Sequence, residues 1–334
     1  MRIAVIGAGS WGTTLADLLA KKGEEVNIWA YEPEVARQIN NSRTNKLFLP
    51  GISLNPGLKA STDLNAVVEG SELVLMVCPS HVYRVLLTRL VSSLSTGAVI
   101  VNACKGIETG TLFRMSEVIR DVVPAEKRAR LVTISGPSFA VEVARERPTV
   151  ITAASESLET AGLVQNLFST NYFRVYVHDD IIGVELGGAL KNVVAIATGM
   201  IDGMELGMNT RAALITRGLV EITRLGVALG AKPGTFAGIS GLGDLVLTCT
   251  GDLSRNRQVG LRIGRGETLA EISQNAYTVA EGIRTTESAY QLSRRHGIEM
   301  PITEQVYKIL FEGSSVKAAI VELMKRELKQ EYRE

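Results

Sequence analysis

The chain opens with Arg2-Ile3-Ala4-Val5-Ile6, an apolar run typical of a buried strand, followed by Gly7-Ala8-Gly9-Ser10-Trp11-Gly12 and a helical pattern over 12–21. The glycine spacing G-x-G-x-x-G between a strand and a helix indicates a dinucleotide-binding turn. The first glycine permits the tight turn, the second lets the backbone approach a pyrophosphate, and the third permits close helix–strand packing. N–H groups at the helix start then face the phosphates. The alternative is a turn without a ligand.

The next expected strand, Val26–Trp29, leads to Glu32, which lies about 20 residues after Gly12, where an acidic residue binds the ribose 2′-hydroxyl of NAD. A carboxylate there repels the additional 2′-phosphate of NADP, so Glu32 favours NAD. The alternative is that Glu32 faces solvent in the loop Tyr31–Pro33.

The two halves of the chain have different patterns. Apolar runs and amphipathic segments alternate in the first half, which predicts an α/β domain over 1–178, with a doubly wound, parallel, Rossmann-type sheet covered by helices on both faces. Helical periodicity dominates afterwards and predicts an all-α C-terminal domain over 179–334. The expected strands are Arg2–Ile6, Val26–Trp29, Leu73–Val77, Ala98–Asn102 and Leu131–Ser135. The expected helices are 12–21, 33–41, 80–92, 112–121, 138–145, Asp179–Met204, Asn209–Leu229, Ser254–Arg262, Leu269–Ser273, Thr285–His296, Thr303–Phe311 and Ser315–Arg326, with a solvated helix face over 322–334.

The composition excludes several classes of protein. Among 334 residues, 36 Lys and Arg balance 35 Asp and Glu, which disfavours partners such as nucleic acids or membrane surfaces, because both attract strongly basic proteins. No uninterrupted apolar window approaches about 18 residues, and the start lacks a signal-peptide pattern, so we expect a soluble, cytoplasmic protein without membrane insertion. Cys78, Cys104 and Cys249 lack metal-ligand spacing and are expected to be reduced core thiols; no metal site is predicted.

Two strand ends place polar groups at one edge of the expected sheet. Strand 98–102 leads to Lys105-Gly106, and strand 131–135 leads to Gly136-Pro137-Ser138. Ligands of open α/β sheets bind outside the carboxyl ends of the strands, so both segments are expected to face one crevice. The alternative for Lys105 is an ordinary exposed loop lysine.

An apolar helix in the second half carries Gly187-Gly188 followed by Lys191-Asn192. A helical glycine costs about 1 kcal/mol relative to alanine, so we interpret these small residues as room for a flat ring or a small substrate. Burial lowers the pKa of a lysine toward the range useful for acid–base catalysis. The alternative is a lysine whose ammonium group reaches the surface.

A third glycine-rich stretch, Gly241–Thr250, contains Asp244 and precedes Ser254-Arg255-Asn256 at a helix start. An Arg and an Asn there suit a phosphate group, because the helix dipole, free N–H groups and a guanidinium combine. The alternatives are simple N-capping by Ser254 and solvent exposure of Arg257. Glycine makes up 32 of 334 residues, and we expect the clusters at 7–12, 106, 136, 187–188 and 241–243 to mark close approach of backbone to ligand.

These stretches, with Lys105–Glu108, Ala213–Gly218 and 279–286, resemble bacterial NAD(P)-dependent glycerol-3-phosphate dehydrogenase over essentially the whole chain. The resemblance implies a helical domain like that of 6-phosphogluconate dehydrogenase. It also implies hydride transfer that interconverts dihydroxyacetone phosphate and sn-glycerol 3-phosphate, supplying glycerophospholipid synthesis, and a homodimer.

The resemblance also implies roles for individual residues. Lys191 would be the general acid/base, Lys105 would contact the substrate from the other side, and Asn192 and Asp244 would complete the catalytic set. The residues implied to bind substrate are Lys105, Gly136, Ser138, Lys191, Asp244, Thr248, Ser254, Arg255 and Asn256. Those implied to border the dinucleotide are Gly7, Gly9, Ser10, Trp11, Gly12, Tyr31, Glu32, Lys105, Ala140, Arg255, Val279 and Glu281.

One departure from the family pattern concerns cofactor choice. Many members have Arg where this chain has Glu32, so NAD is expected to be preferred to NADP. Two other functions are also open: a dehydrogenase of the same architecture acting on a β-hydroxy acid or 6-phosphogluconate, and a redox-sensing NAD-binding protein without catalysis.

Overall fold

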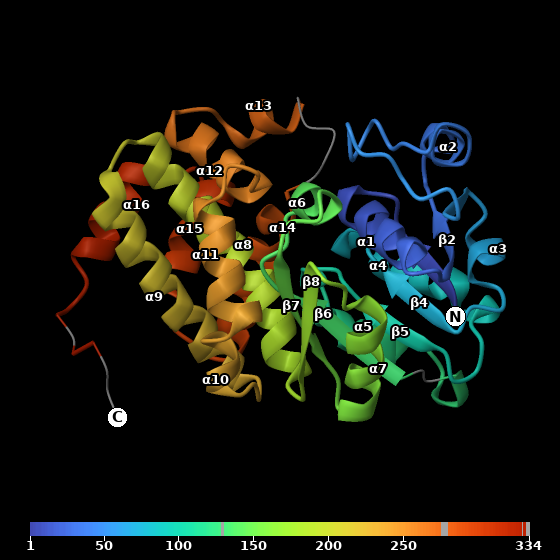
Figure 1. The fold of residues 1–334 in the computed structure, drawn as a ribbon. Coiled ribbons are helices and arrows are strands. Elements are labelled where there is room, and N and C mark those ends of the chain that lie inside the picture. The colour runs from blue at the N-terminus through green and yellow to red at the C-terminus, as the bar shows by residue number, and fades with distance from the viewer. Residues whose placement is uncertain (128–129, 275–279, 329, 332–334) are drawn as a thin grey trace.

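A computed structural model describes residues 1–127, 130–274, 280–328 and 330–331 and divides them between a sheet domain and a helical domain packed side by side (Figure 1). The sheet ends at His178, and the first long helix of the second domain begins at Ile181. The strands are β1 Arg2–Ile6, β2 Glu25–Trp29, β3 Lys59–Ser61, β4 Leu73–Met76, β5 Val99–Asn102, β6 Arg130–Ser135, β7 Thr149–Ala154 and β8 Phe173–His178. The helices of the sheet domain are α1 Ser10–Lys21, α2 Pro33–Arg37, α3 Leu64–Val68, α4 Ser80–Leu90, α5 Met115–Val122, α6 Ala140–Ala144 and α7 Leu158–Phe168.

The sheet has the order β3-β2-β1-β4-β5-β6-β7-β8, and β6–β7 is its antiparallel pair. Neighbouring parallel strands are in close register, with Ile6 opposite Met76 and Met76 opposite Asn102, so the ends of β1, β4 and β5 share one edge. One face packs against α1 and α7, and the other packs against α3, α4 and α5. The predicted doubly wound architecture is confirmed.

Five predicted strands are present, with bounds that differ by at most one residue at each end, whereas β3, β7, β8, α3 and α7 were not predicted. β3 is a three-residue edge strand without a buried residue. In β8, the other edge strand, Arg174 and Tyr176 are exposed, so no continuous apolar run marks it. Edge strands bury less side-chain surface than central ones, and their sequence signal is correspondingly weak.

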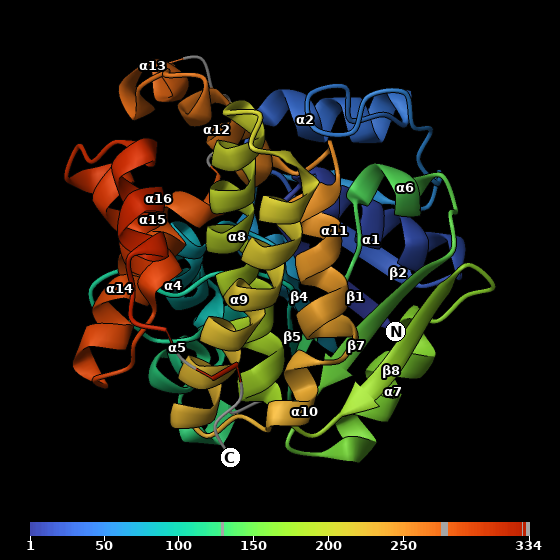
Figure 2. The same ribbon diagram turned by 90° about the vertical axis from the view of Figure 1, so that its left-hand side faces the viewer.

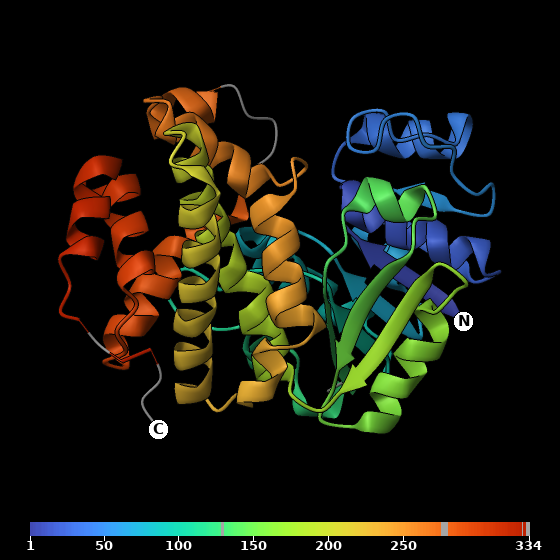
Figure 3. The ribbon, with the colours of Figure 1, turned by 60° about the vertical axis from the view of Figure 1, so that its left-hand side comes forward.

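Helix α8 is the centre of the second domain. By length and composition it could cross a membrane, but 94% of the qualifying window is buried inside the protein. It runs beside α9 and α11 (Figure 2), and α15 and α16 lie on the side of the helical domain away from the sheet (Figure 3). The helices of this domain are α8 Ile181–Gly203, α9 Gly207–Ala228, α10 Pro233–Phe236, α11 Asp244–Thr250, α12 Arg255–Gly264, α13 Leu269–Gln274, α14 Glu281–Arg295, α15 Pro301–Phe311 and α16 Val316–Met324.

The second half deviates from the sequence pattern at several points: α10 was not predicted, and α14 begins at Glu281 rather than at Thr285. The glycine-rich stretch was not expected to form α11, a short helix that follows directly on a π-helical turn at Ile239–Gly243. The expected helix face over 322–334 is wrong in its extent, because α16 ends at Met324 and its C-cap, Lys325, is followed by non-helical residues. Leu328 is fully exposed, so no packing stabilises a longer helix there.

Helices α8 and α12 pack against each other through glycines. Gly199 and Gly203 of α8 face Gly260 and Gly264 of α12, and a Cβ on any of the four would lie 2.0–2.3 Å from a backbone oxygen of the facing helix. Such distances are far below van der Waals contact. The two backbones therefore touch directly, and this fixes the start of α12 relative to α8.

Gly260→Ala is expected to lower the free energy of unfolding by about 1–3 kcal/mol, because the added methyl group forces the helices apart. Urea unfolding followed by circular dichroism measures the change. Gly162→Ala in α7 is the matched control: outside its own helix, no described atom lies within 4 Å of the added Cβ, and alanine favours a helix by about 1 kcal/mol. Equal stability of Gly260→Ala and the unsubstituted protein would contradict the direct backbone contact.

Candidate active site

A buried carboxylate lies between two lysines from different parts of the chain. Asp244, the first residue of α11, accepts a hydrogen bond on Oδ1 from Lys191 Nζ of α8. Its Oδ2 accepts one from Lys105 Nζ, 2.8 Å away, and Lys105 follows the end of β5. Lys191 also donates to Thr248 Oγ1 at 2.9 Å, one turn after Asp244. Because Asp244 and Thr248 share one face of α11, a single helix turn holds the Lys191 ammonium group from two sides.

Burial and neighbouring charges set the pKa values of Lys191 and Asp244. Lys191 is 5% exposed and Asp244 is 1% exposed. Burial, which penalises the charged ammonium form, and the nearby charge of Lys105 together lower the pKa of Lys191 to about 7, against the attraction of Asp244. Burial alone would raise the pKa of Asp244, but Lys105 and Lys191 together hold it below its usual value. Lys191 therefore titrates near neutrality beside an ionised carboxylate. The alternative in which Lys191 reaches the surface is wrong.

The ends of β5 and β6 form one wall of the site, as predicted. Lys105 Nζ also donates to the carbonyl oxygen of Gly136 at 3.0 Å, and Ser138 Oγ donates to the same oxygen at 3.0 Å. Ser135, which was not predicted, has its Oγ 3.5 Å from Asp244 Oδ2. Its position as the last residue of an apolar strand at this edge is the signal that could have identified it.

Three elements meet beside Lys191 through side-chain amides. Asn256 Nδ2 donates to Asn192 Oδ1 at 2.8 Å, and Asn256 Oδ1 accepts from the N–H of Gly282 at 2.9 Å. Asn192 Nδ2 lies 3.4 Å from the carbonyl oxygen of Lys105. These contacts join α8, α12, α14 and the segment at Lys105 after β5, so the two amides are held rigidly next to the lysines.

The start of α12 carries the residues that were predicted to bind a phosphate group. Ser254 is the N-cap, and its Oγ accepts from the N–H of Arg257 at 3.3 Å, so its capping role is confirmed. Arg255 is exposed on the first turn. Arg257 is buried and pairs with Asp202 at 2.8 Å and Asp252 at 2.9 Å, so the alternative of a solvent-exposed Arg257 is wrong. The ion pair with Asp202 anchors the start of α12 to the end of α8.

The glycine-rich turn has the backbone geometry that a dinucleotide requires. Gly7 has φ +120°, and a Cβ there would lie 2.9 Å from the carbonyl oxygen of Val77. A Cβ on Gly12 would lie 1.9 Å from the carbonyl oxygen of Gly7. On Gly9 a Cβ would meet no described atom within 4 Å, so the side on which a pyrophosphate would approach is open. The three glycines therefore fit the separate roles that their spacing predicts.

Side chains around this turn are placed as follows. Ser10 Oγ donates to the carbonyl oxygen of Phe48, and the Trp11 ring packs against Phe173 with ring centroids 6.3 Å apart. Tyr31 is 76% exposed beyond the end of β2. Glu32 is partly exposed and precedes α2, and its carboxylate does not cap that helix.

The remaining predicted cofactor residues come from α6 and α14. Ala140 is the first residue of α6, and its carbonyl oxygen accepts from Thr14 Oγ1 of α1 at 3.2 Å. Glu281 accepts from the N–H of Ser80 at 3.1 Å and from Ser80 Oγ at 2.6 Å, so α14 reaches the start of α4. Val279 lies outside the described residues.

The expectation that the other glycine clusters approach a ligand is wrong at several positions, because protein atoms fill the space. A Cβ on Gly187 would lie 2.8 Å from the carbonyl oxygen of Ser240, and one on Gly188 would lie 2.5 Å from Ser135 Oγ. Gly241 packs in the same way on the backbone of Phe236. No room for a flat ring exists at Gly187-Gly188. These glycines instead let α8 approach β6 and the turn before α11.

The cysteines are buried and unpaired, as predicted. Burial raises the pKa of Cys78 and Cys249 to about 12, so neither is a thiolate at neutral pH. Within the described ranges, no group of three or more His, Cys, Asp or Glu residues could hold a metal ion. The charged groups at the centre of the site are therefore Lys105, Lys191 and Asp244, rather than a thiolate or a cluster of metal ligands.

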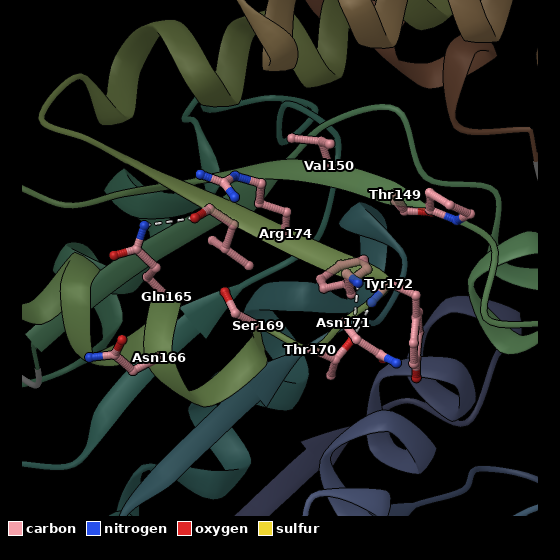
Figure 4. Close-up of a pocket in the computed structure, with 12 residues that line it drawn as sticks. Thr149, Val150, Gln165, Asn166, Ser169, Thr170, Asn171, Tyr172 and Arg174 are labelled. Carbon is pink, nitrogen blue, oxygen red and sulfur yellow. Dashed lines mark hydrogen bonds between the residues drawn. The ribbon is translucent and has the colours of Figure 1, made fainter.

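A separate hollow of about 440 Å³ lies between α7, β7 and β8 (Figure 4). Its lining includes Gln165, Tyr172 and Arg174, and none of the predicted site residues lines it. The Gln165 side chain donates to the carbonyl oxygen of Val175 at 2.7 Å. The hollow is therefore not part of the lysine site.

Together, the fold and site define a dinucleotide-dependent dehydrogenase with a Rossmann-type domain and a helical domain that supplies a buried lysine. The chain belongs to the NAD-dependent glycerol-3-phosphate dehydrogenase family. The family's N-terminal model matches residues 2–161, and its C-terminal model matches residues 180–321.

Individual relatives support this placement. The chain is 57% identical to the glycerol-3-phosphate dehydrogenase [NAD(P)+] of Geobacter sp. (strain M21) over 330 residues, covering 99% of this chain and 98% of the relative. The crystal structure of glycerol-3-phosphate dehydrogenase from Coxiella burnetii has a TM-score of 0.92 at 41% identity, covering 97% of this chain and 98% of that one. A ketopantoate reductase from Ralstonia eutropha, with a TM-score of 0.61 at 15% identity over 97% and 100% of the chains, shares the fold alone.

Asp244→Asn is expected to lower the free energy of unfolding by about 3–5 kcal/mol, because it removes the buried anion between two ammonium groups. Urea unfolding at pH 7 measures the loss. Asp252→Asn is the control, since that carboxylate also pairs with a cation but its side chain is 91% exposed, and it should change stability far less. Equal, small losses in the two variants would contradict the central role of Asp244.

Proposed function

We propose that this protein interconverts dihydroxyacetone phosphate and sn-glycerol 3-phosphate with a nicotinamide dinucleotide. The observation that carries the proposal is Lys191, whose buried amine, with a pKa of about 7, lies beside Asp244 and faces the same carboxylate as Lys105. Family membership supports this substrate. We assign cofactor binding to residues 1–178 and substrate binding and catalysis to residues 179–334.

The dinucleotide would bind along the turn Gly7–Gly12, with its pyrophosphate over Gly9 and the start of α1. Tyr31 and Glu32 lie beyond β2, on the side where the adenosine would bind. When bound, the reduced nicotinamide supplies the hydride that is added to C2 of the substrate. The ends of β5 and β6 and helix α8 would bring Lys105 and Lys191 to that end of the cofactor.

Lys191 is the group that donates and removes the proton at the C2 oxygen. In the reducing direction its ammonium form donates a proton to the developing alkoxide, and in the oxidising direction its neutral form accepts that proton. Thr248 and Asp244 hold its nitrogen in place. Lys105 adds a second positive charge that stabilises negative charge at the oxygen.

The start of α12 would bind the substrate phosphate. Ser254, Arg255 and Asn256 combine a hydroxyl, a guanidinium group and an amide at a helix N-terminus, where the helix dipole favours an anion. Since Asn256 is bonded to Asn192, next to Lys191, phosphate binding positions C2 near the proton donor. Gly136 and Ser138 would contact the other side of the substrate.

We further propose that the protein prefers NAD, acts in the cytoplasm as a homodimer, and supplies glycerol 3-phosphate for glycerophospholipid synthesis. The cofactor preference is supported by Glu32, whose negative charge would repel the 2′-phosphate of NADP.

Initial rates with dihydroxyacetone phosphate and either NADH or NADPH test substrate and cofactor together. We expect turnover with both reduced cofactors and a higher kcat/KM with NADH. Glu32→Arg should move that ratio toward NADPH, and Lys46→Arg on the following loop, which adds a guanidinium group without changing the net charge, should leave it unchanged. Oxidation of a β-hydroxy acid or 6-phosphogluconate, without activity on the triose phosphate, would support the alternative dehydrogenase. Tight NADH binding without turnover would support a sensor.

Replacing Lys191 by Ala should reduce kcat by about 10²–10⁴-fold, because the proton donor is lost. Lys191→Ala retaining more than about a tenth of kcat would contradict the assignment.

In the unsubstituted enzyme, kcat/KM for reduction should fall as the pH rises through about 7, because the ammonium form of Lys191 loses its proton. Over the same pH range, kcat/KM for oxidation should rise.

Arg255→Ala should chiefly raise the KM for the phosphorylated substrate.

A further inference from the structure

A second buried carboxylate lies on the helix that carries Lys191. Glu185 is 6% exposed on α8, less than two turns before Lys191, and it points into the sheet domain. Its Oε1 accepts from the N–H of Ser116 at 2.8 Å. Its Oε2 accepts from Ser116 Oγ at 2.6 Å and from Arg114 at 2.9 Å. The start of α5 is thereby tied to α8.

The same carboxylate also reaches the end of β5. Asn102 Nδ2 and Thr133 Oγ1 lie 3.4 and 3.3 Å from Glu185 Oε1. Asn102 Oδ1 in turn accepts from the N–H of Cys104 at 3.1 Å, in the turn that leads into Lys105. Glu185 therefore contacts the side chain that shapes this turn.

The loop that begins at Lys105 is closed on itself at its far end. Ile107 forms an antiparallel bridge with Arg114, and the N–H of Glu108 donates to the carbonyl oxygen of Phe113 at 2.9 Å. Both ends of the loop are thus held by Glu185, one through Asn102 and the other through Arg114. The long lysine side chain alone would not fix this backbone, because it has many rotamers.

We propose that Glu185 is a positioning residue that fixes the Lys105 loop against the helix carrying Lys191, so that both ammonium groups face Asp244. The proposal rests on the proposed function, in which these two lysines act at the substrate oxygen. Glu185 itself lies among residues of β5, β6 and α5 and acts only through the loop.

The proposal predicts an electrostatic consequence that a loss of packing would not have. The charge of Lys105 helps to lower the pKa of Lys191. In Glu185→Gln, the new amide would direct N–H groups at donors of Arg114 or Ser116, so the network cannot be satisfied. If the loop then moves Lys105 away, the pKa of Lys191 rises. Lys105→Met should produce the same rise by removing the charge.

The test is a pH titration of the Lys191 side chain in the full-length protein. NMR of ¹³Cε-labelled lysine monitors the titration, and the signal that is lost in Lys191→Met is assigned to Lys191. We expect Glu185→Gln to raise the pKa of Lys191 by about 1, Lys105→Met to do the same, and the double variant to show no further rise. The fall of kcat/KM for reduction with rising pH should shift to higher pH by the same amount.

Glu221→Gln is the matched control. Glu221 is also a buried glutamate, and it accepts from the N–H groups of Ile302 at 2.6 Å and Thr303 at 3.1 Å at the start of α15, away from the lysines. Its substitution should cost stability without changing the titration of Lys191. If Glu185→Gln behaves like Glu221→Gln, the positioning role is overturned.

Asn102→Ala provides a second variant in case Glu185→Gln does not fold, because it cuts the contact with the Cys104 turn and leaves the Glu185–Arg114 pair intact. It should also raise the pKa of Lys191, and an unchanged value would overturn the proposal. The NMR titration needs no turnover. Absence of activity on dihydroxyacetone phosphate would therefore contradict the proposed function, while the titration would still decide the role of Glu185.

Discussion

The placement of one carboxylate between two ammonium groups is the constraint on which the site depends. Asp244 is almost completely buried, so its charge is compatible with folding only because Lys191 and Lys105 neutralise it. Burial lowers the pKa of the Lys191 amine to about 7, and the charge of the second lysine, Lys105, contributes to the same lowering. The same arrangement therefore serves both stability and acid–base chemistry.

Helix α8 brings the parts of this site together. It carries Lys191 and Asn192, receives α12 through the glycine contact at Gly199 and Gly260, and holds the sheet domain through Glu185. Each contact is either backbone to backbone or buried and charged, so each has little freedom to shift. The site between the domains is consequently built from one rigid helix and the strand ends that pack on it.

Much of the fold could be predicted from the sequence because central strands and long helices bury continuous or periodic apolar surface. The first glycine turn was also predictable, since its three glycines have roles that local geometry defines. The prediction was wrong where glycines serve packing between distant segments: Gly187 contacts Ser240, and Gly188 contacts Ser135. A glycine that faces a ligand and one that faces a neighbouring helix have the same sequence signal.

The sequence by itself determined the doubly wound sheet, the dinucleotide turn and the presence of a lysine in an apolar helix, because these follow from local periodicity and spacing. Only the tertiary structure decided that Asp244 joins Lys191 to Lys105 and that Arg257 is buried in an ion pair with Asp202. It also revealed the contact of Glu185 with Arg114. Such pairs depend on segments far apart in the chain. Their charges are buried only because the packing of these distant segments excludes water, and no local pattern encodes that exclusion.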